Sequence, residues 1–149
     1  MEKKIGCYIC TGCGIGDALD VKALGNIATK EQKIPVVKNH EFLCGTEGIA
    51  MIRKDLTDEG VNALVIAGCS HRVKNEEFRL GIAQMDRVDL RDKCLWVLDV
   101  PEGDDTAEED RQMMAEDYIR VGCVKVKKMN DPNPYEASTP FSKVVLVVG

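Results

Sequence analysis

Short apolar runs alternate with helix-patterned stretches along this chain, and this alternation limits the possible folds more than any other feature. The run Val61–Gly68 is almost unbroken in its apolar character, as is typical of a strand covered on both faces of a parallel sheet. Similar strands are predicted at residues 4–10, 34–38 and 85–90, with helices at 18–30, 46–59, 76–83 and 106–128. We therefore predict a single α/β domain with a mostly parallel sheet of four or five strands and helices on both faces, flavodoxin-like or Rossmann-like.

Local signals indicate where these helices begin and end. Thr46 is expected to cap the helix that follows it, and Gly60 to follow the last turn of the same helix. The residues Thr106–Glu109 fit a capping box at the start of the long last helix. Beyond it we expect a linker and a final strand at 143–149, which divides the chain into a domain at 1–130 and an appended segment at 131–149.

Four cysteines are expected to meet at one edge of the predicted sheet. Cys10 and Cys13 form a Cys-x-x-Cys turn directly after the first strand, Cys44 follows the second strand, and Cys69 follows the third. The carboxyl ends of parallel strands lie at the same edge of a sheet, which is where such folds bind ligands. Three separate segments should therefore bring four thiols together.

The other three of the seven cysteines carry weaker signals. Cys94 joins the same edge if the fourth strand ends near Leu90, and it lies inside that strand if the strand runs on through Trp96. Cys7 precedes the first turn and Cys123 falls in the last turns of a helix, so we interpret both as core residues.

Four thiolates held by irregular backbone, two of them in a close Cys-x-x-Cys pair, are the usual ligands of an iron–sulfur cluster. We predict that Cys10, Cys13, Cys44 and Cys69 hold such a cluster, with Cys94 as a fifth candidate for a metal ligand. Four ligands suffice for either common type, so the sequence does not choose between them; as a working assignment we favour 4Fe–4S over 2Fe–2S.

Several alternatives stay open at this point. The same four thiolates could hold a zinc ion, or Cys10 and Cys13 alone could form a thioredoxin-like dithiol. The thiols could also be inert, in a docking or assembly module without catalytic activity. His71 and Arg72 flank Cys69 and would either tune a cluster through hydrogen bonds or form a solvated loop.

Composition argues against several other classes of function. The net charge of −5 over 149 residues is unlike the basic footprint of a nucleic-acid-binding protein. No apolar run approaches the roughly 18 residues of a membrane-spanning helix, and the first residues lack the pattern of a signal peptide. We therefore expect a cytoplasmic protein that binds neither nucleic acid nor membrane, in which seven cysteines indicate metal or redox chemistry and not a disulfide framework.

Four segments around these cysteines resemble one known family, in the same order and with similar spacing over about residues 4–148. The segments are Tyr8-Ile-Cys-Thr-Gly-Cys-Gly14, Leu43-Cys-Gly-Thr-Glu-Gly48, Ala67-Gly-Cys-Ser-His-Arg72 and Leu90-Arg-Asp-Lys-Cys-Leu-Trp-Val97. Together they resemble the N-terminal domain of the heterodisulfide reductase A subunit, an iron–sulfur flavoprotein. The first three are also similar to the iron–sulfur D subunit of the hydrogenase that partners this reductase.

The resemblance implies an electron-transfer component of a soluble, flavin-based electron-bifurcating complex, an oxidoreductase component that is not catalytic on its own. By position it implies ligation by the four strand-end cysteines, and Cys94 matches a further cysteine of the family. The tail Val145–Gly149 resembles the first strand of the family's flavin-binding domain, so FAD is expected on a partner or another domain. The expected partners are other subunits or domains of such a complex, or a second copy of the chain paired through the C-terminal strand.

Overall fold

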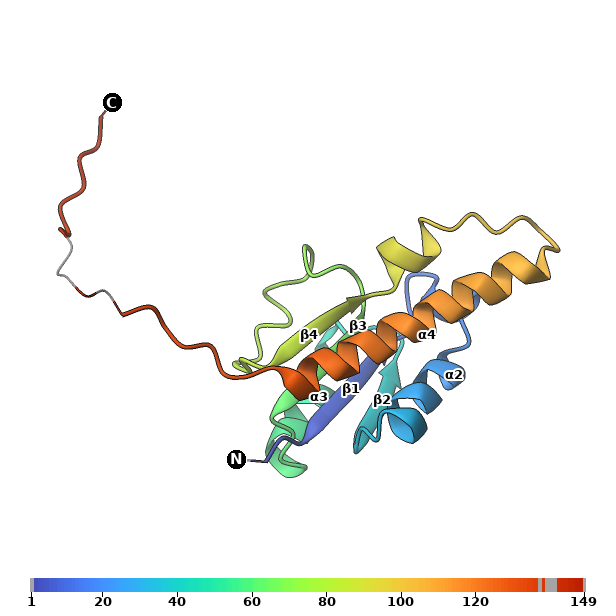
Figure 1. Ribbon diagram of the computed structural model, residues 1–149, viewed down its shortest axis with the longest axis horizontal. Helices are drawn as coiled ribbons and strands as arrows, with labels where there is room; N and C mark the ends of the chain where they lie inside the picture. The colour runs from blue at the N-terminus through green and yellow to red at the C-terminus, as the bar shows by residue number, and fades with distance from the viewer. Residues whose placement is uncertain (1, 137, 139–141, 149) are drawn as a thin grey trace.

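A parallel sheet forms the centre of the computed structural model, which describes residues 2–136, 138 and 142–148 (Figure 1). Its four strands are β1 (Ile5–Cys10), β2 (Val36–His40), β3 (Ala63–Gly68) and β4 (Met85–Asp89). They lie in the order β2-β1-β3-β4, and every neighbouring pair is parallel. The predicted α/β class and mostly parallel sheet are therefore confirmed.

The strands differ in burial according to their place in the sheet. Every residue of the central strands β1 and β3 is buried, as their continuous apolar character predicts. The edge strand β2 is only partly buried and begins at Val36, two residues later than predicted. Pro35 lies just outside it, because proline has no N–H to donate to the neighbouring strand.

Helices cover both faces of the sheet, as predicted (Figure 1). They are α1 (Ile15–Ala18), α2 (Val21–Asn26), the π-helix η1 (Ile27–Glu31), α3 (Thr46–Asp58), the π-helix η2 (Arg91–Leu95) and α4 (Asp105–Lys128). The long helix α4 crosses one face beside α2, and α3 lies behind the sheet (Figure 1). Tyr8 of β1 donates a hydrogen bond of 2.9 Å to Asp55 of α3, so its side chain points to the α3 face.

Cys7, the preceding residue of β1, points to the opposite face and meets Cys123 of α4. Both side chains are fully buried, in keeping with the core role predicted for them. A hydrogen bond with Cys123, together with burial, raises the pKa of the Cys7 thiol well above its usual value. This pair therefore belongs to the packing between sheet and helix.

The predicted helix boundaries need three corrections. Residues 76–83 form turns and irregular backbone, not a helix. The predicted helix at 18–30 is divided, because Asp20 adopts an extended conformation and caps α2 by accepting a hydrogen bond from the Ala23 N–H. At α4 the cap is Asp104, whose carboxylate accepts from the Ala107 N–H at 3.0 Å, so the predicted capping box at 106–109 is wrong.

For α3, the structure corrects the predicted N-cap and confirms the glycine predicted after the last turn. Its N-cap is Gly45, without a side-chain hydrogen bond, and Thr46 is the first helical residue. Gly60 follows the helix with φ of +64°, the left-handed conformation expected of a C′ glycine.

The C-terminal segment has no regular structure where the structure describes it. Residues 142–148 form no strand, and the side chains of Val144–Val148 are 81–87% exposed. The strand predicted at 143–149 is thus not formed by the described part of that range, since a strand needs a neighbour; Gly149 lies outside the described residues. Among the described residues, no helix is both long and apolar enough to cross a membrane.

Candidate metal centre

The strand order creates the place at which the cysteines meet. From β1 the chain goes to β2 on one side and then to β3 on the other, so the carboxyl ends of β1 and β3 flank a topological switch point. Cys10 is the last residue of β1, and Cys69 directly follows β3. Cys44 lies in the turn between β2 and α3, next to the N-cap of α3.

The turn after β1 adopts an unusual backbone conformation to present Cys13. Cys13 has φ of +55° and Gly14 has φ of +83°, both in the left-handed region. For a residue with a side chain this conformation costs roughly 1 kcal/mol. A Cβ atom on Gly12 would lie 2.1 Å from the carbonyl oxygen of Glu41, so only glycine lets this turn pack against the loop that carries Cys44.

All four predicted strand-end thiols lie close to one another. Cys10, Cys44 and Cys69 line one cavity of about 10 Å³, roughly the space of a single water molecule. Burial raises the pKa of the Cys69 thiol; the charge of Arg91 opposes this rise, and the nearby Cys10, Cys13 and Cys44 thiols add to it. The Cys13 side chain is exposed, and therefore marks the solvent side of the group.

The spacing of these thiols bears on what they could hold. Among the described residues, no group of three Cys, His, Asp or Glu side chains is arranged so that it could hold a single metal ion. A zinc ion would require its sulfur ligands about 2.3 Å from one centre. The ligands of a polynuclear cluster bind different iron atoms, so their sulfurs stand farther apart. Both an iron–sulfur cluster and a zinc ion take thiolate ligands of the kind that these four cysteines supply.

Cys94 lies apart from this group. It belongs to η2, shortly after β4, and its side chain is fully buried. Burial, followed by the charge of Asp89, raises the pKa of its thiol to about 11. Cys94 does not line the cavity that Cys10, Cys44 and Cys69 share. The structure thus brings four of the five candidate ligands together and places the fifth in the core.

Sequence reasoning missed a basic residue beside the thiols. Arg87 of β4 lines the same cavity, and its guanidinium carbon lies 4.3 Å from the centre of the Phe78 ring. One Arg87 nitrogen donates hydrogen bonds to the backbone carbonyls of Cys69, Ser70 and Val73, at 3.4, 3.2 and 3.3 Å. The edge strand β4 carries three charged residues, Asp86, Arg87 and Asp89, so its sequence did not single out Arg87.

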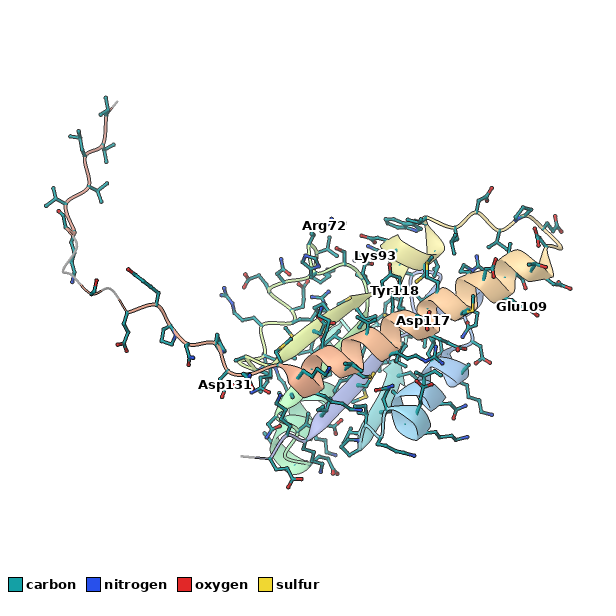
Figure 2. All side chains as sticks on the ribbon, viewed as in Figure 1. Arg72, Lys93, Glu109, Asp117, Tyr118 and Asp131 are labelled. Carbon is teal, nitrogen blue, oxygen red and sulfur yellow. The ribbon has the colours of Figure 1, made fainter. Side chains whose placement is uncertain are left out.

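The two polar residues that the sequence singled out are less closely involved. Arg72 is 72% exposed, pairs with Asp92 at 3.6 Å, and lies on the outer side of the loop after β3 (Figure 2). His71 is also exposed. The structure therefore favours the interpretation of these residues as a solvated loop.

Comparison with known proteins gives a consistent set of relatives, although no family model matches the chain. It is 33% identical to the A subunit of the H(2):CoB-CoM heterodisulfide,ferredoxin reductase of Methanothermobacter marburgensis, over 99% of this chain and 22% of that protein. It is 30% identical to the A subunit of the ferredoxin:CoB-CoM heterodisulfide reductase of Methanosarcina mazei, over 98% and 18%. An iron-sulfur A subunit of the CoB–CoM heterodisulfide reductase of Methanopyrus kandleri is 26% identical, over 85% and 20%. The chain spans about a fifth of the length of these relatives.

Proposed function

Since this chain is homologous to one part of the heterodisulfide reductase A subunit, we propose that it is an electron-transfer component of a related redox complex. In this proposal Cys10, Cys13, Cys44 and Cys69 hold an iron–sulfur cluster, 4Fe–4S in preference to 2Fe–2S. The observation that carries the proposal is the convergence of four thiols from three separate loops at one edge of the sheet. A relative named as an iron-sulfur subunit supports it.

The residues of the chain would have distinct tasks at this centre. The cluster itself would supply one-electron transfer. Cys10 is buried and would anchor the cluster to β1, whereas the exposed Cys13 would lie on the side open to a redox partner. Gly12 and the left-handed Cys13 keep the first cysteine loop against the second. Cys94, buried in η2, remains an alternative ligand.

We further propose that flavin chemistry and electron bifurcation take place on partner subunits or domains. The glycines at 12, 14 and 16 follow a cysteine turn and lack the G-x-G-x-x-G spacing of a dinucleotide-binding loop. Residues 131–149 would then be a linker and the beginning of a flavin-binding domain. A cytoplasmic location is part of the same proposal, because free thiols persist in reducing compartments.

Two other functions compete with this proposal. A dithiol redox domain would use Cys10 and Cys13 alone and would leave the convergence of Cys44 and Cys69 without a role. A docking module is favoured by the exposed apolar side chains of the C-terminal segment. Iron and sulfide analysis of the anaerobically purified chain separates both from a cluster-binding protein, since neither alternative binds iron with sulfide.

As an alternative to the start of a flavin-binding domain, we propose that the C-terminal segment pairs with the same segment of a second copy of the chain. Exposed Val144–Val148 offer an apolar surface with unpaired backbone groups. Leu146→Asp should convert a dimer at micromolar concentration into a monomer, because the buried contact would receive a charge. Sedimentation velocity measures the proportions of dimer and monomer. Ser142→Asp is the control, because it adds the same charge outside the apolar run. A wild-type chain that is monomeric under the same conditions would contradict the proposal.

A further inference from the structure

Arg87 forms no direct ion pair with a carboxylate within the described part of the chain. It takes part in none of the ion pairs found there. Its Nε atom is buried without a hydrogen-bond partner, and its terminal nitrogen donates only to neutral backbone carbonyls. An unpaired charge of this kind is costly to bury.

The carboxylates nearest to Arg87 in the fold are engaged elsewhere. Asp89 is two residues along β4, and its Oδ1 accepts a hydrogen bond of 3.0 Å from the Asp92 N–H at the start of η2. Glu77, on the loop after β3, pairs with Lys74 at 2.9 Å. Cys10, Cys44 and Cys69 line the same cavity as Arg87, so its charge also lies beside these thiols.

We propose that Arg87 is a counter-charge of the four-thiol group, in addition to the Arg91 charge beside Cys69, and stabilises the negative charge that the thiolates carry when they bind metal. The guanidinium is held in place by the Phe78 ring on one side and by the carbonyls of Cys69, Ser70 and Val73 on the other. The inference rests on the proposed function, since it assigns a role at the same site. Arg87 acts as a positioning residue: its hydrogen bond orders the Cys69 loop, and its charge favours the more negative, reduced form of a bound cluster.

The test compares Arg87→Gln, which removes the charge and keeps an amide donor, with Arg87→Lys, which keeps the charge. Arg79→Met is the matched control, because the Arg79 side chain is 78% exposed and pairs with Glu76 at 3.5 Å. Two quantities are measured: the midpoint potential of the reconstituted cluster, and the affinity of the cluster-free chain for Co²⁺, followed by its thiolate absorption. Arg87→Gln should lower the potential and weaken Co²⁺ binding about tenfold or more, because a partly buried charge is lost. Arg87→Lys should keep a potential and a Co²⁺ affinity close to those of the wild type. Arg79→Met should change neither the potential nor the affinity.

Each outcome decides between specific possibilities. A cluster that forms in the wild type, with unchanged potential and Co²⁺ affinity in Arg87→Gln, would overturn the inference and leave the proposed function standing. A wild type that forms no cluster but binds Co²⁺ in an Arg87-dependent way would support the inference and overturn the cluster proposal. A wild type that binds neither would overturn both. Circular dichroism establishes that the variants fold, and Arg87→Met replaces Arg87→Gln if the latter does not.

Discussion

Replacing any one of Cys10, Cys13, Cys44 and Cys69 by serine should abolish or strongly reduce the broad visible absorption of the reconstituted chain at about 400 nm. A neutral hydroxyl is a poor substitute for a thiolate on iron, so a cluster that depends on four thiolates should not survive the loss of one. The measurement is an absorption spectrum of each variant after anaerobic reconstitution with iron and sulfide. Equal tolerance of all four replacements would contradict the ligand assignment.

Cys7→Ser and Cys123→Ser are the controls for this series. Both thiols lie in the core between β1 and α4, away from the carboxyl edge of the sheet. Their replacement should leave the absorption intact and lower the free energy of unfolding by about 1 kcal/mol. Loss of the absorption in either control would mean that the spectrum reports on folding and not on ligation.

Cys94→Ser separates the two possible ligand sets. The structure places Cys94 in the core, so the variant should retain the absorption. Loss of the absorption in Cys94→Ser together with its retention in Cys13→Ser would mean that Cys94 is the fourth ligand and that η2 rearranges to deliver it.

Gly122→Val should lower the free energy of unfolding by about 3 kcal/mol, because overpacking of a tight core contact forces its neighbours apart. Gly122 lies where α4 crosses the sheet, and a Cβ atom there would be 2.3 Å from Cγ2 of Val88 and 3.4 Å from Cγ1 of Val65. The short, branched side chain of Val88 cannot turn away from this contact as a long side chain would. Urea denaturation followed by circular dichroism measures the effect.

Gly25→Val provides the matched control on a second helix. A Cβ atom on Gly25 would lie 4.0 Å from Cγ1 of Val37, which is ordinary van der Waals contact. The substitution should therefore change the free energy of unfolding by less than about 0.5 kcal/mol. Similar losses of stability in the two variants would contradict the close packing of α4 on the sheet.

The strands could be predicted from the sequence because burial on both faces leaves a direct signature. The central strands β1 and β3 are continuous apolar runs, and both are fully buried in the sheet. Once the sheet was predicted to be parallel, the positions of Cys10, Cys44 and Cys69 followed from the rule that strand ends share one edge. The convergence of the thiols thus rests on topology, which local sequence patterns specify well.

The features that sequence could not predict depend on contacts between distant segments. Turns and irregular backbone at 76–83 replace a predicted helix, and Gly81 adopts φ of +74°, which is outside the helical region. The fit of Gly12 against Glu41 requires two loops to be in place. Such contacts leave no periodic pattern in either segment.

The most direct test of cluster binding is the iron and acid-labile sulfide content of the full chain after anaerobic purification, with zinc measured in the same sample. We expect about four iron and four sulfide per chain, or about two of each if the cluster is 2Fe–2S, and little zinc. Anaerobic reconstitution should restore these values to any cluster-depleted fraction. Stoichiometric zinc without sulfide, or neither iron nor sulfide even after reconstitution, would contradict the assignment of an iron–sulfur centre to these four cysteines.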